Sequence, residues 1–452
     1  MTVLSQKHDT TGILGRQAAR ESAARTYARH FPIVPVRAEG MTLYGADGKA
    51  YLDCLAGAGT LALGHNHPVV IEAIRATIDA GRPLHTLDLA TPEKDAFVEA
   101  LFATLPAGFA ATAKVQFCGP AGTDAVEAAI KLAQTATGRG GVLAFTGAYH
   151  GMTLAALSAS GGVATRAPLA GPHLDVTRLP YPYAYRCPLG LGGQAGTDAA
   201  ATYVERLLAD PNGGVVTPAA MLLEPVQGEG GVIPAPDGWL RRMRATTRHH
   251  DIPLIVDEVQ TGVGRTGAMW AHEHSGIVPD VLVAAKAIGG GLPLAVTLYR
   301  DDLDVWEPGA HAGTFRGTTL ALAAGTATLR FVAENDLPAH ADVVGAQLLD
   351  GLEALSAEHP QIGDVRGRGL MLGVELVDPA GTIDHLGARP AAPQLATRVR
   401  AECLERGLIV ELGGRHDAVL RLLPPLIITE EQADAVLDRL ADALAAAVHA
   451  SA

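Results

Sequence analysis

The 452-residue chain is predicted to be an α/β protein with a mostly parallel sheet, and two features of the sequence support this. From about residue 70 to residue 325, short apolar segments alternate with helical segments, which is typical of a parallel sheet covered by helices. The apolar segments are hydrophobic at nearly every position, as expected for strands buried on both faces. The expected strands are residues 115–118, 142–145, 220–224, 253–257, 281–285 and 294–298, and the expected helices include 123–137 and 239–250.

The two ends of the chain differ from this central part. Residues 1–40 are polar and rich in Arg and Ala, and residues 41–53 predict a hairpin with an Ala-Asp-Gly turn. Residues 365–376 and 408–412 are expected to be strands of a second, smaller sheet. Residues 429–432 (TEEQ) predict a capping box that begins a C-terminal helix.

These patterns predict three parts of the chain. We expect an N-terminal segment of residues 1–70 that packs with the small domain, a large domain of residues 71–325, and a small C-terminal domain of residues 326–452.

The composition excludes several classes of protein. With 48% hydrophobic and 18% charged residues the chain is globular, and its net charge of −13 disfavours binding to nucleic acid or to an anionic membrane. We expect no membrane span, because no apolar run approaches about 20 residues, and no secretory signal. The four cysteines are far apart and show no CxxC pattern, so a disulfide framework is not expected. A soluble cytoplasmic protein is predicted.

A strand-to-helix turn follows the first expected strand, at residues 117–127 (FCGPAGTDAVE). The start of a helix has unpaired N–H groups and the positive end of the helix dipole, and both favour a phosphate group. Gly122 would allow a ligand to approach closely, and Thr123 would add a hydroxyl. The segment is neither a Walker motif nor GxGxxG, so a nucleotide is not favoured, and an ordinary strand–helix turn is the alternative.

Two further strands end in ionisable residues. Asp257 and Glu258 follow four apolar residues, and the carboxyl end of a parallel strand is where such sheets bind ligands. An Asp that caps the next helix would give the same pattern. Lys286 ends an apolar strand, precedes three glycines, and is the only one of six lysines after residue 131. Partial burial would favour its neutral amine, which suits a Schiff base with an aldehyde cofactor, whereas a lysine with a buried stem and a solvated head is the alternative.

Together the three features match what pyridoxal 5′-phosphate (PLP) requires. A carboxylate such as Asp257 keeps the pyridine nitrogen protonated, so that the ring accepts electrons. Lys286 would bind the aldehyde and later move a proton, and the helix start at Gly122 would hold the phosphate. The sequence therefore predicts PLP as the cofactor.

From about residue 30 to its end, the chain resembles the class III (ornithine- and 4-aminobutyrate-type) aminotransferases, which are fold-type I PLP enzymes. The resemblance rests on the order and spacing of Lys286 and of residues 119–127, 145–151 (FTGAYHG), 224–231 (EPVQGEGG) and 256–262 (VDEVQTG). It implies a large PLP-binding domain with a mostly parallel sheet and a smaller α+β domain. Residues 54–68, 181–188 and 313–317 are similar to members of the family that act on L-2,4-diaminobutyrate and 2-oxoglutarate.

The resemblance also implies a role for each matching residue. The implied cofactor contacts are Lys286 with the aldehyde, Asp257 with the pyridine nitrogen, Gln260 with the phenolic oxygen, Tyr149 and Val259 with the two ring faces, and Gly122 and Thr123 with the phosphate. Thr314 would reach the phosphate of the other subunit. A homodimer with shared active sites is therefore implied.

Two more residues are implied to select the substrate. Arg421 would bind a substrate carboxylate, for which its planar guanidinium is suited. Glu224 is interpreted as the glutamate that neutralises Arg421 in one half-reaction and releases it in the other. Such a switch is useful because glutamate places a carboxylate beside the reacting carbon, whereas diaminobutyrate reacts through its terminal amine. A structural ion pair is the alternative.

The implied reaction is a ping-pong transfer of an amino group from L-glutamate to L-aspartate 4-semialdehyde, which gives L-2,4-diaminobutyrate and 2-oxoglutarate. His85, Thr86 and Asp88 are candidates for holding the far end of the substrate. Another ω-amine (ornithine, 4-aminobutyrate or lysine), a PLP decarboxylase or racemase, and a dimeric binding protein are the alternatives. Thr318 stands where the family commonly has asparagine, which leaves fine specificity open.

Two histidine pairs, at residues 65 and 67 and at residues 272 and 274, do not predict a metal site. Histidines two residues apart do not share a helix face, and no third ligand is spaced nearby. We expect no metal cofactor.

Overall fold

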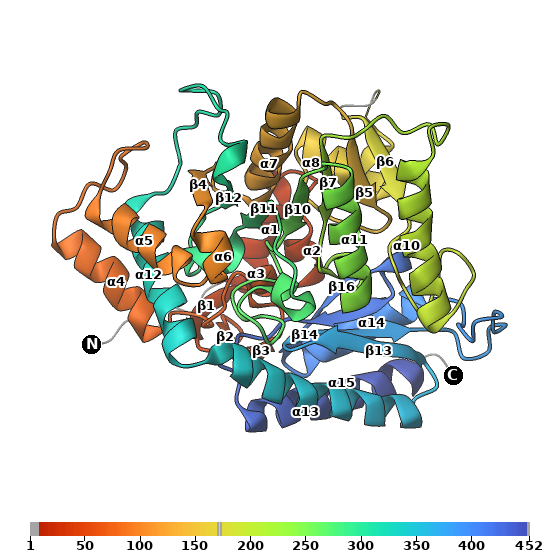
Figure 1. The fold of residues 1–452 in the computed structure, drawn as a ribbon. Coiled ribbons are helices and arrows are strands. Elements are labelled where there is room, and N and C mark those ends of the chain that lie inside the picture. Colours follow the sequence, from red (N-terminus) through yellow and green to blue (C-terminus); the bar gives the residue numbers. More distant parts are fainter. Residues whose placement is uncertain (1–8, 170, 172–173, 450–452) are drawn as a thin grey trace.

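The computed structural model describes residues 9–169, 171 and 174–449. Its largest sheet has seven strands in the order β4-β12-β11-β10-β7-β5-β6 (Figure 1). These strands are β4 (Ala113–Phe117), β5 (Val142–Phe145), β6 (Val176–Leu179), β7 (Ala220–Leu223), β10 (Leu254–Asp257), β11 (Val281–Ala284) and β12 (Val296–Arg300). Within this sheet β12 runs antiparallel to both neighbours and the other strands are parallel to one another. The predicted mostly parallel α/β fold is confirmed. The sequence pattern found six of the seven strands and missed β6.

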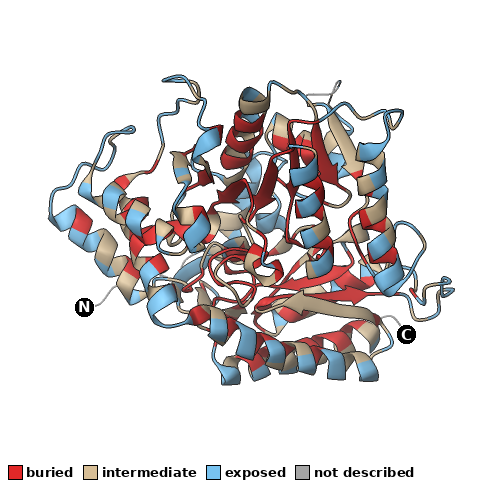
Figure 2. Cartoon of the chain, viewed as in Figure 1, coloured by how far each residue is buried: buried red, intermediate tan, exposed pale blue. Residues whose placement is uncertain are grey.

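Both faces of the seven-stranded sheet are covered by helices. Helices α7 (Gly122–Thr137) and α8 (Leu154–Ala159) cover one face, and α10 (Gly193–Ala209) and α11 (Asp237–His249) cover the other. The central strands are therefore buried along their whole length (Figure 2). In β7, alternate residues pack against opposite pairs of helices, which explains why the strand is hydrophobic at every position.

Two smaller four-stranded sheets lie beside the large one. One contains β1 (Pro35–Glu39), β2 (Thr42–Gly45), β3 (Ala50–Asp53) and β15 (Leu408–Ile409), and the other contains β13 (Ile362–Arg368), β14 (Met371–Leu376), β17 (Val419–Leu422) and β16 (Glu411–Gly413). The hairpin predicted at residues 41–53 is confirmed as β2 and β3.

The prediction of a single second sheet was wrong in two details. Residues 365–376 form two strands that turn at Gly369, where φ is +55° and an added Cβ would lie 2.6 Å from a backbone carbon of Thr266. Residues 408–412 are divided between both small sheets, because β15 pairs in parallel with β3 whereas β16 pairs with β17.

The remaining elements surround these sheets. They are α1 (Thr10–Arg20), α2 (Tyr27–His30), α3 (Ala56–Gly59), α4 (Pro68–Asp79), α5 (Pro92–Phe102), α6 (Ala107–Ala110), α9 (Val163–Arg166), α12 (Thr319–Glu334), α13 (Leu337–Glu358), α14 (Pro393–Glu405), α15 (Glu430–His449), β8 (Val226–Gln227), β9 (Ile233–Pro234) and four 3₁₀ helices, η1 (Ala271–Ser275), η2 (Lys286–Gly289), η3 (Asp301–Leu303) and η4 (Arg415–Asp417). The predicted capping box is confirmed, because Thr429 and Gln432 exchange side chain–backbone hydrogen bonds of 3.1 and 3.2 Å at the start of α15.

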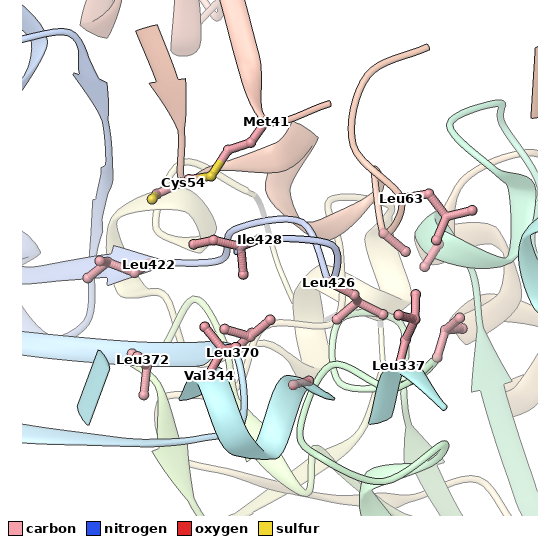
Figure 3. Close-up of a cluster of buried hydrophobic side chains, with 14 of the residues drawn as sticks. Met41, Cys54, Leu63, Leu337, Val344, Leu370, Leu372, Leu422, Leu426 and Ile428 are labelled. Carbon is pink, nitrogen blue, oxygen red and sulfur yellow. The ribbon is translucent and has the colours of Figure 1, made fainter. Parts of the chain in front are cut away.

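The N-terminal and C-terminal parts of the chain share one hydrophobic core. Met41 and Cys54 pack in the same buried cluster as Val344 of α13 and Leu372 and Leu422 of the C-terminal sheet (Figure 3). The domain boundary predicted between residues 325 and 326 falls inside α12. The division into three domains therefore stays a prediction.

Two further observations concern the environment of the chain. Among the described residues, no helix is long and apolar enough to cross a membrane. All four cysteines have free thiols, and three of them, Cys54, Cys118 and Cys403, are buried.

The amino-terminal end of β11 depends on a buried ion pair. Asp280 accepts hydrogen bonds from Arg244 Nη1 and Nη2 of α11 at 2.5 and 2.8 Å, and from the backbone N–H of Leu254 at 2.8 Å. Asp280→Ala should lower the free energy of unfolding by about 3–5 kcal/mol, because it leaves the Arg244 charge buried without its partner. Thermal denaturation measures the loss. Asp302→Ala, which removes an exposed partner of Arg300, is the control, and an equal loss in both variants would contradict the prediction.

Candidate active site

One cavity at the carboxyl edge of the large sheet contains most of the predicted site. Its volume is about 240 Å³, and its lining includes eight of the ten predicted residues, namely Gly122, Thr123, Tyr149, Glu224, Asp257, Val259, Gln260 and Lys286. These residues lie at the carboxyl end of β10 or in the segments that follow β4, β5, β7, β10 and β11. Because parallel strands end at the same edge, residues far apart in the sequence meet there.

Asp257 is the last residue of β10 and is buried. Its Oδ2 lies 2.8 Å from Nδ1 of His150, and its Oδ1 accepts the N–H of Val259 at 3.0 Å. His150 is itself buried, and its Nε2 has no hydrogen-bond partner within the described part of the chain. The sequence analysis missed His150, although it lies within the FTGAYHG motif next to Tyr149.

Lys286 is the first residue of η2, two residues after the end of β11. Its φ of +52° is in the left-handed region, which a residue with a side chain adopts only where the surrounding structure holds it. Burial lowers the pKa of the Lys286 amine, while the carboxylates of Glu229 and Asp257 oppose this shift. The environment therefore favours a neutral, nucleophilic amine, as the sequence predicted.

Gly122 opens the 16-residue helix α7 at the floor of the cavity. A Cβ at Gly122 would lie 2.8 Å from Cγ1 of Val259, so glycine is required for this close packing. The hydroxyl of Thr123 lies 2.6 Å from that of Thr153 and accepts the N–H of Thr153 at 3.2 Å. The helix start therefore presents its N–H groups to a narrow space that suits a phosphate.

The amide of Gln260 is fixed from one side. Its Nε2 donates to the carbonyl of Ala58 at 3.1 Å, and its Oε1 is buried without a partner among the described residues. Ala58 belongs to α3, whose four residues all have positive φ, between 47° and 89°. A Cβ at Gly228 would lie 1.9 Å from Oε1 of Gln260, so this wall also needs a glycine.

Arg421 pairs with a different glutamate from the one that we predicted. Its Nη1 and Nη2 donate to Oε1 and Oε2 of Glu229 at 2.7 and 2.8 Å. Glu224 instead accepts the backbone N–H groups of Tyr149 and Gly228 at 2.9 and 3.0 Å. The interpretation of Glu224 as the charge partner of Arg421 is wrong, because the turn after β8 carries Glu229, and not Glu224, to the guanidinium.

The loop expected to hold the far end of the substrate is not in this cavity. None of His85, Thr86 and Asp88 lines it. His85 Nε2 lies 2.9 Å from the carbonyl oxygen of Thr314, and Asp88 Oδ2 pairs with Arg316 Nη2 at 2.7 Å. The 85–88 loop is therefore attached to the 313–317 segment, and its predicted contact with the far end of the substrate stays a prediction.

Thr314 lies within the 313–317 segment, and Thr318 directly follows it. Thr314 is exposed and lies outside the cavity of its own chain, so its predicted contact with a second subunit stays a prediction. Thr318 is the N-cap residue of α12, and its side chain makes no capping hydrogen bond.

The two histidine pairs have other partners. His65 Nε2 lies 2.8 Å from Asp53 Oδ2, and His272 Nδ1 lies 3.0 Å from Glu258 Oε1. His67 packs against the ring of Phe331, and His274 lies 3.2 Å from the hydroxyl of Thr266. Among the described residues, no group of three or more His, Cys, Asp or Glu residues could hold a metal ion.

The family model for "Aminotransferase class-III" matches residues 23–444. The chain belongs to the class-III aminotransferases. Two curated relatives are named "Diaminobutyrate--2-oxoglutarate aminotransferase". That from Rhizobium meliloti (strain 1021) is 56% identical over 98% of this chain and 93% of its own length. That from Haemophilus influenzae is 46% identical over 94% of this chain and 93% of its own length.

Solved structures agree with this family. An amine transaminase from an uncultivated Pseudomonas species, solved in the PLP-bound form, matches with a TM-score of 0.84 and 31% identity, and covers 94% of this aminotransferase and 98% of that chain. The ornithine aminotransferase from Toxoplasma gondii ME49 matches with a TM-score of 0.81 and 27% identity, and covers 98% and 97% of the two chains. The predicted fold-type I architecture is confirmed.

The cavity of this aminotransferase fits PLP. It contains a helix start suited to an anion, a buried carboxylate (Asp257) and a partly buried lysine (Lys286). A Cβ at Gly122 or at Gly228 would collide with Val259 or Gln260, so both glycines keep space free at the cavity. Two buried polar atoms, His150 Nε2 and Gln260 Oε1, have no partner among the described residues. PLP is therefore the cofactor that the family and this cavity support.

Gly122→Ala should weaken the binding of PLP about tenfold or more, because the new methyl group must displace Val259 at the helix start. Titration of the apoenzyme with PLP, followed by absorbance, measures the affinity. Gly140→Ala is the control, since nothing lies within 4 Å of a Cβ at that position. Equal affinity in both variants would contradict the close packing at Gly122.

Proposed function

We propose that this aminotransferase moves an amino group from L-glutamate to L-aspartate 4-semialdehyde, which gives L-2,4-diaminobutyrate and 2-oxoglutarate. The relatives named for diaminobutyrate and 2-oxoglutarate, at 56% and 46% identity, support this substrate pair. The observation that supports it most directly is the Arg421–Glu229 pair, whose glutamate lines the Lys286 cavity. A paired arginine beside a nucleophilic lysine suits an enzyme that must accept one substrate with, and one without, a carboxylate at the reacting carbon.

Several residues of the cavity have a role in the proposed reaction. PLP supplies a ring that accepts electrons from the reacting carbon. Asp257, oriented by His150, would hold the proton on the ring nitrogen, while Gly122 and Thr123 would hold the phosphate. Lys286 Nζ would take the proton from the reacting carbon of the amino donor and later donate it again, so the same amine would act first as the base and then as the acid. The lowered pKa of Lys286 favours this role.

Arg421 and Glu229 would select between the two substrates. Arg421 would bind the α-carboxylate of glutamate, after Glu229 turns away from it. The side chain of Arg421 is 1% exposed and that of Glu229 is 32% exposed, so Glu229 is the partner that has room to move. When the diamine reacts, no carboxylate lies beside the reacting carbon, and Glu229 would neutralise Arg421 again.

We also propose that the enzyme is a homodimer in the cytoplasm. Thr314 is exposed and outside its own cavity, which leaves it free to contact the cofactor phosphate of a second subunit. Tyr149 and Met152 line the cavity and are 41% and 54% exposed, as expected if a second subunit covers its mouth. Free thiols at all four cysteines suit a reducing compartment.

Lys286→Ala should reduce turnover of glutamate with L-aspartate 4-semialdehyde at least 100-fold, because within the described part of the chain no other lysine lines the cavity to move the proton. The assay follows 2-oxoglutarate and identifies the amino product by mass. Lys131→Ala, on an exposed face of α7, is the control. If the wild-type enzyme instead aminates with ornithine, 4-aminobutyrate or lysine in preference to diaminobutyrate, the proposed substrate is wrong and the aminotransferase assignment remains.

Glu229→Gln should affect the two half-reactions differently. The amide cannot neutralise Arg421, so the half-reaction with diaminobutyrate should slow about tenfold or more, while the half-reaction with glutamate changes little. Stopped-flow absorbance of the cofactor separates the two. An equal change in both half-reactions would show that Glu229 does not act as a switch.

A further inference from the structure

Glu224 is a buried carboxylate that the proposed reaction does not use. It directly follows β7, it is 6% exposed, and it lines the cavity. Its oxygens have separate partners, since Oε1 accepts the N–H of Tyr149 at 2.9 Å and Oε2 accepts the N–H of Gly228 at 3.0 Å. A buried carboxylate is costly unless it is well hydrogen-bonded, so this arrangement needs a reason.

The two N–H groups belong to two segments that border the cavity, because Tyr149 lines it and Gly228 directly precedes Glu229, which also lines it. Tyr149 lies in the loop after β5, and Gly228 lies in the turn after β8, directly under the amide of Gln260. One more hydrogen bond joins the same segments, from Gln227 Nε2 to the carbonyl of Thr146 at 3.0 Å. Glu224 is itself held in place, because Tyr181 Oη donates to its carbonyl oxygen at 2.8 Å.

We propose that Glu224 is a positioning residue whose ionised carboxylate joins the Tyr149 loop to the Gly228 turn and so fixes these two segments at the border of the cavity. The effect is indirect, because Glu224 acts through the backbone of Tyr149, which lines the cavity, and of Gly228, which directly precedes the cavity residue Glu229. This inference rests on the proposed function for its kinetic test, but the geometry of the two segments does not depend on the identity of the substrate.

The proposal predicts a dependence on pH. Burial raises the pKa of Glu224 to about 7, and the carboxylate of Asp257 adds to this shift, whereas His150 and the two N–H donors oppose it. Below that pH the carboxyl group is protonated, and the oxygen that carries the proton becomes a donor and a weaker acceptor for one of the two N–H groups. The link between the two segments should therefore weaken, and turnover should fall, as the pH decreases through about 7.

Other ionisable groups face the same space. Tyr149 comes from the loop after β5, Glu229 from the turn after β8, Lys286 from η2 and Arg421 from β17. Burial raises the pKa of Tyr149, so this phenol keeps its proton as the pH decreases through 7, whereas burial lowers the pKa of Lys286 and makes it a second group that gains a proton as the pH decreases. A variant at position 224 is therefore needed to assign the decrease in turnover at low pH, which is the acidic limb of the pH profile, to Glu224.

The first test compares the pH dependence of kcat between the Glu224→Gln and wild-type holoenzymes. The amide is isosteric, keeps one acceptor oxygen and cannot ionise. We expect kcat to fall about 10-fold to 100-fold at pH 8, and the decrease in kcat below pH 7 to disappear. Glu205→Gln, which removes a partly exposed pair with Arg242 outside the cavity lining, is the matched control and should keep the wild-type profile. If Glu224→Gln keeps the acidic limb of the wild type, or keeps full activity, the proposal is overturned.

The second test needs neither substrate nor variant. Amide hydrogen exchange of the wild-type holoenzyme, followed by mass spectrometry and corrected for the intrinsic effect of pH, should show faster exchange at pH 6 than at pH 8 in peptides that cover residues 146–152 and 226–231. Peptides from β10 serve as the internal control. Unchanged exchange in the two segments would overturn the proposal even if Glu224→Gln did not fold. If glutamate and the semialdehyde fail to react, the proposed function fails while this measurement still decides the role of Glu224.

Discussion

The active site depends on the parallel pairing of three neighbouring strands. β10 pairs with β7 on one side and with β11 on the other, so the segments that contain Glu224, Asp257 and Lys286 end at one edge. The register is fixed because both faces of each strand are buried, and a shift by one residue would exchange the side chains that face α7 with those that face α11. Helix packing on the sheet thus determines where the catalytic groups meet.

The lining of the cavity carries more acidic than basic side chains. Three carboxylates and one lysine line it, while Arg421 approaches through its contact with Glu229. The carboxylates differ in what they touch, since Asp257 contacts a histidine, Glu224 contacts backbone N–H groups and Glu229 contacts a guanidinium. The same side-chain chemistry can therefore serve three purposes, because the environment of each group sets its charge and its freedom to move.

Features encoded by local sequence could be predicted, and features set by tertiary contacts could not. Asp257 and Lys286 were recognisable because each ends an apolar strand, and the start of α7 was recognisable from its small residues. The choice between Glu224 and Glu229 was not, because the turn between them has no periodicity that shows which side chain faces Arg421. The contact of His150 with Asp257 spans 107 residues, and the attachment of the 85–88 loop to the 313–317 segment spans more than 200, so neither has a local signal.

The left-handed conformation of α3 has a consequence for how this enzyme can change. All four residues of Ala56–Gly59 have positive φ, and the carbonyl of Ala58 holds the amide of Gln260. Valine, isoleucine and threonine are disfavoured in such a backbone, so substitution of the segment favours glycine, alanine and the few polar residues that tolerate it. To accept bulkier amines, the enzyme would therefore need changes in the side chains around this turn. Substitutions that shift the backbone of residues 56–59 out of the left-handed region would displace the carbonyl that holds Gln260.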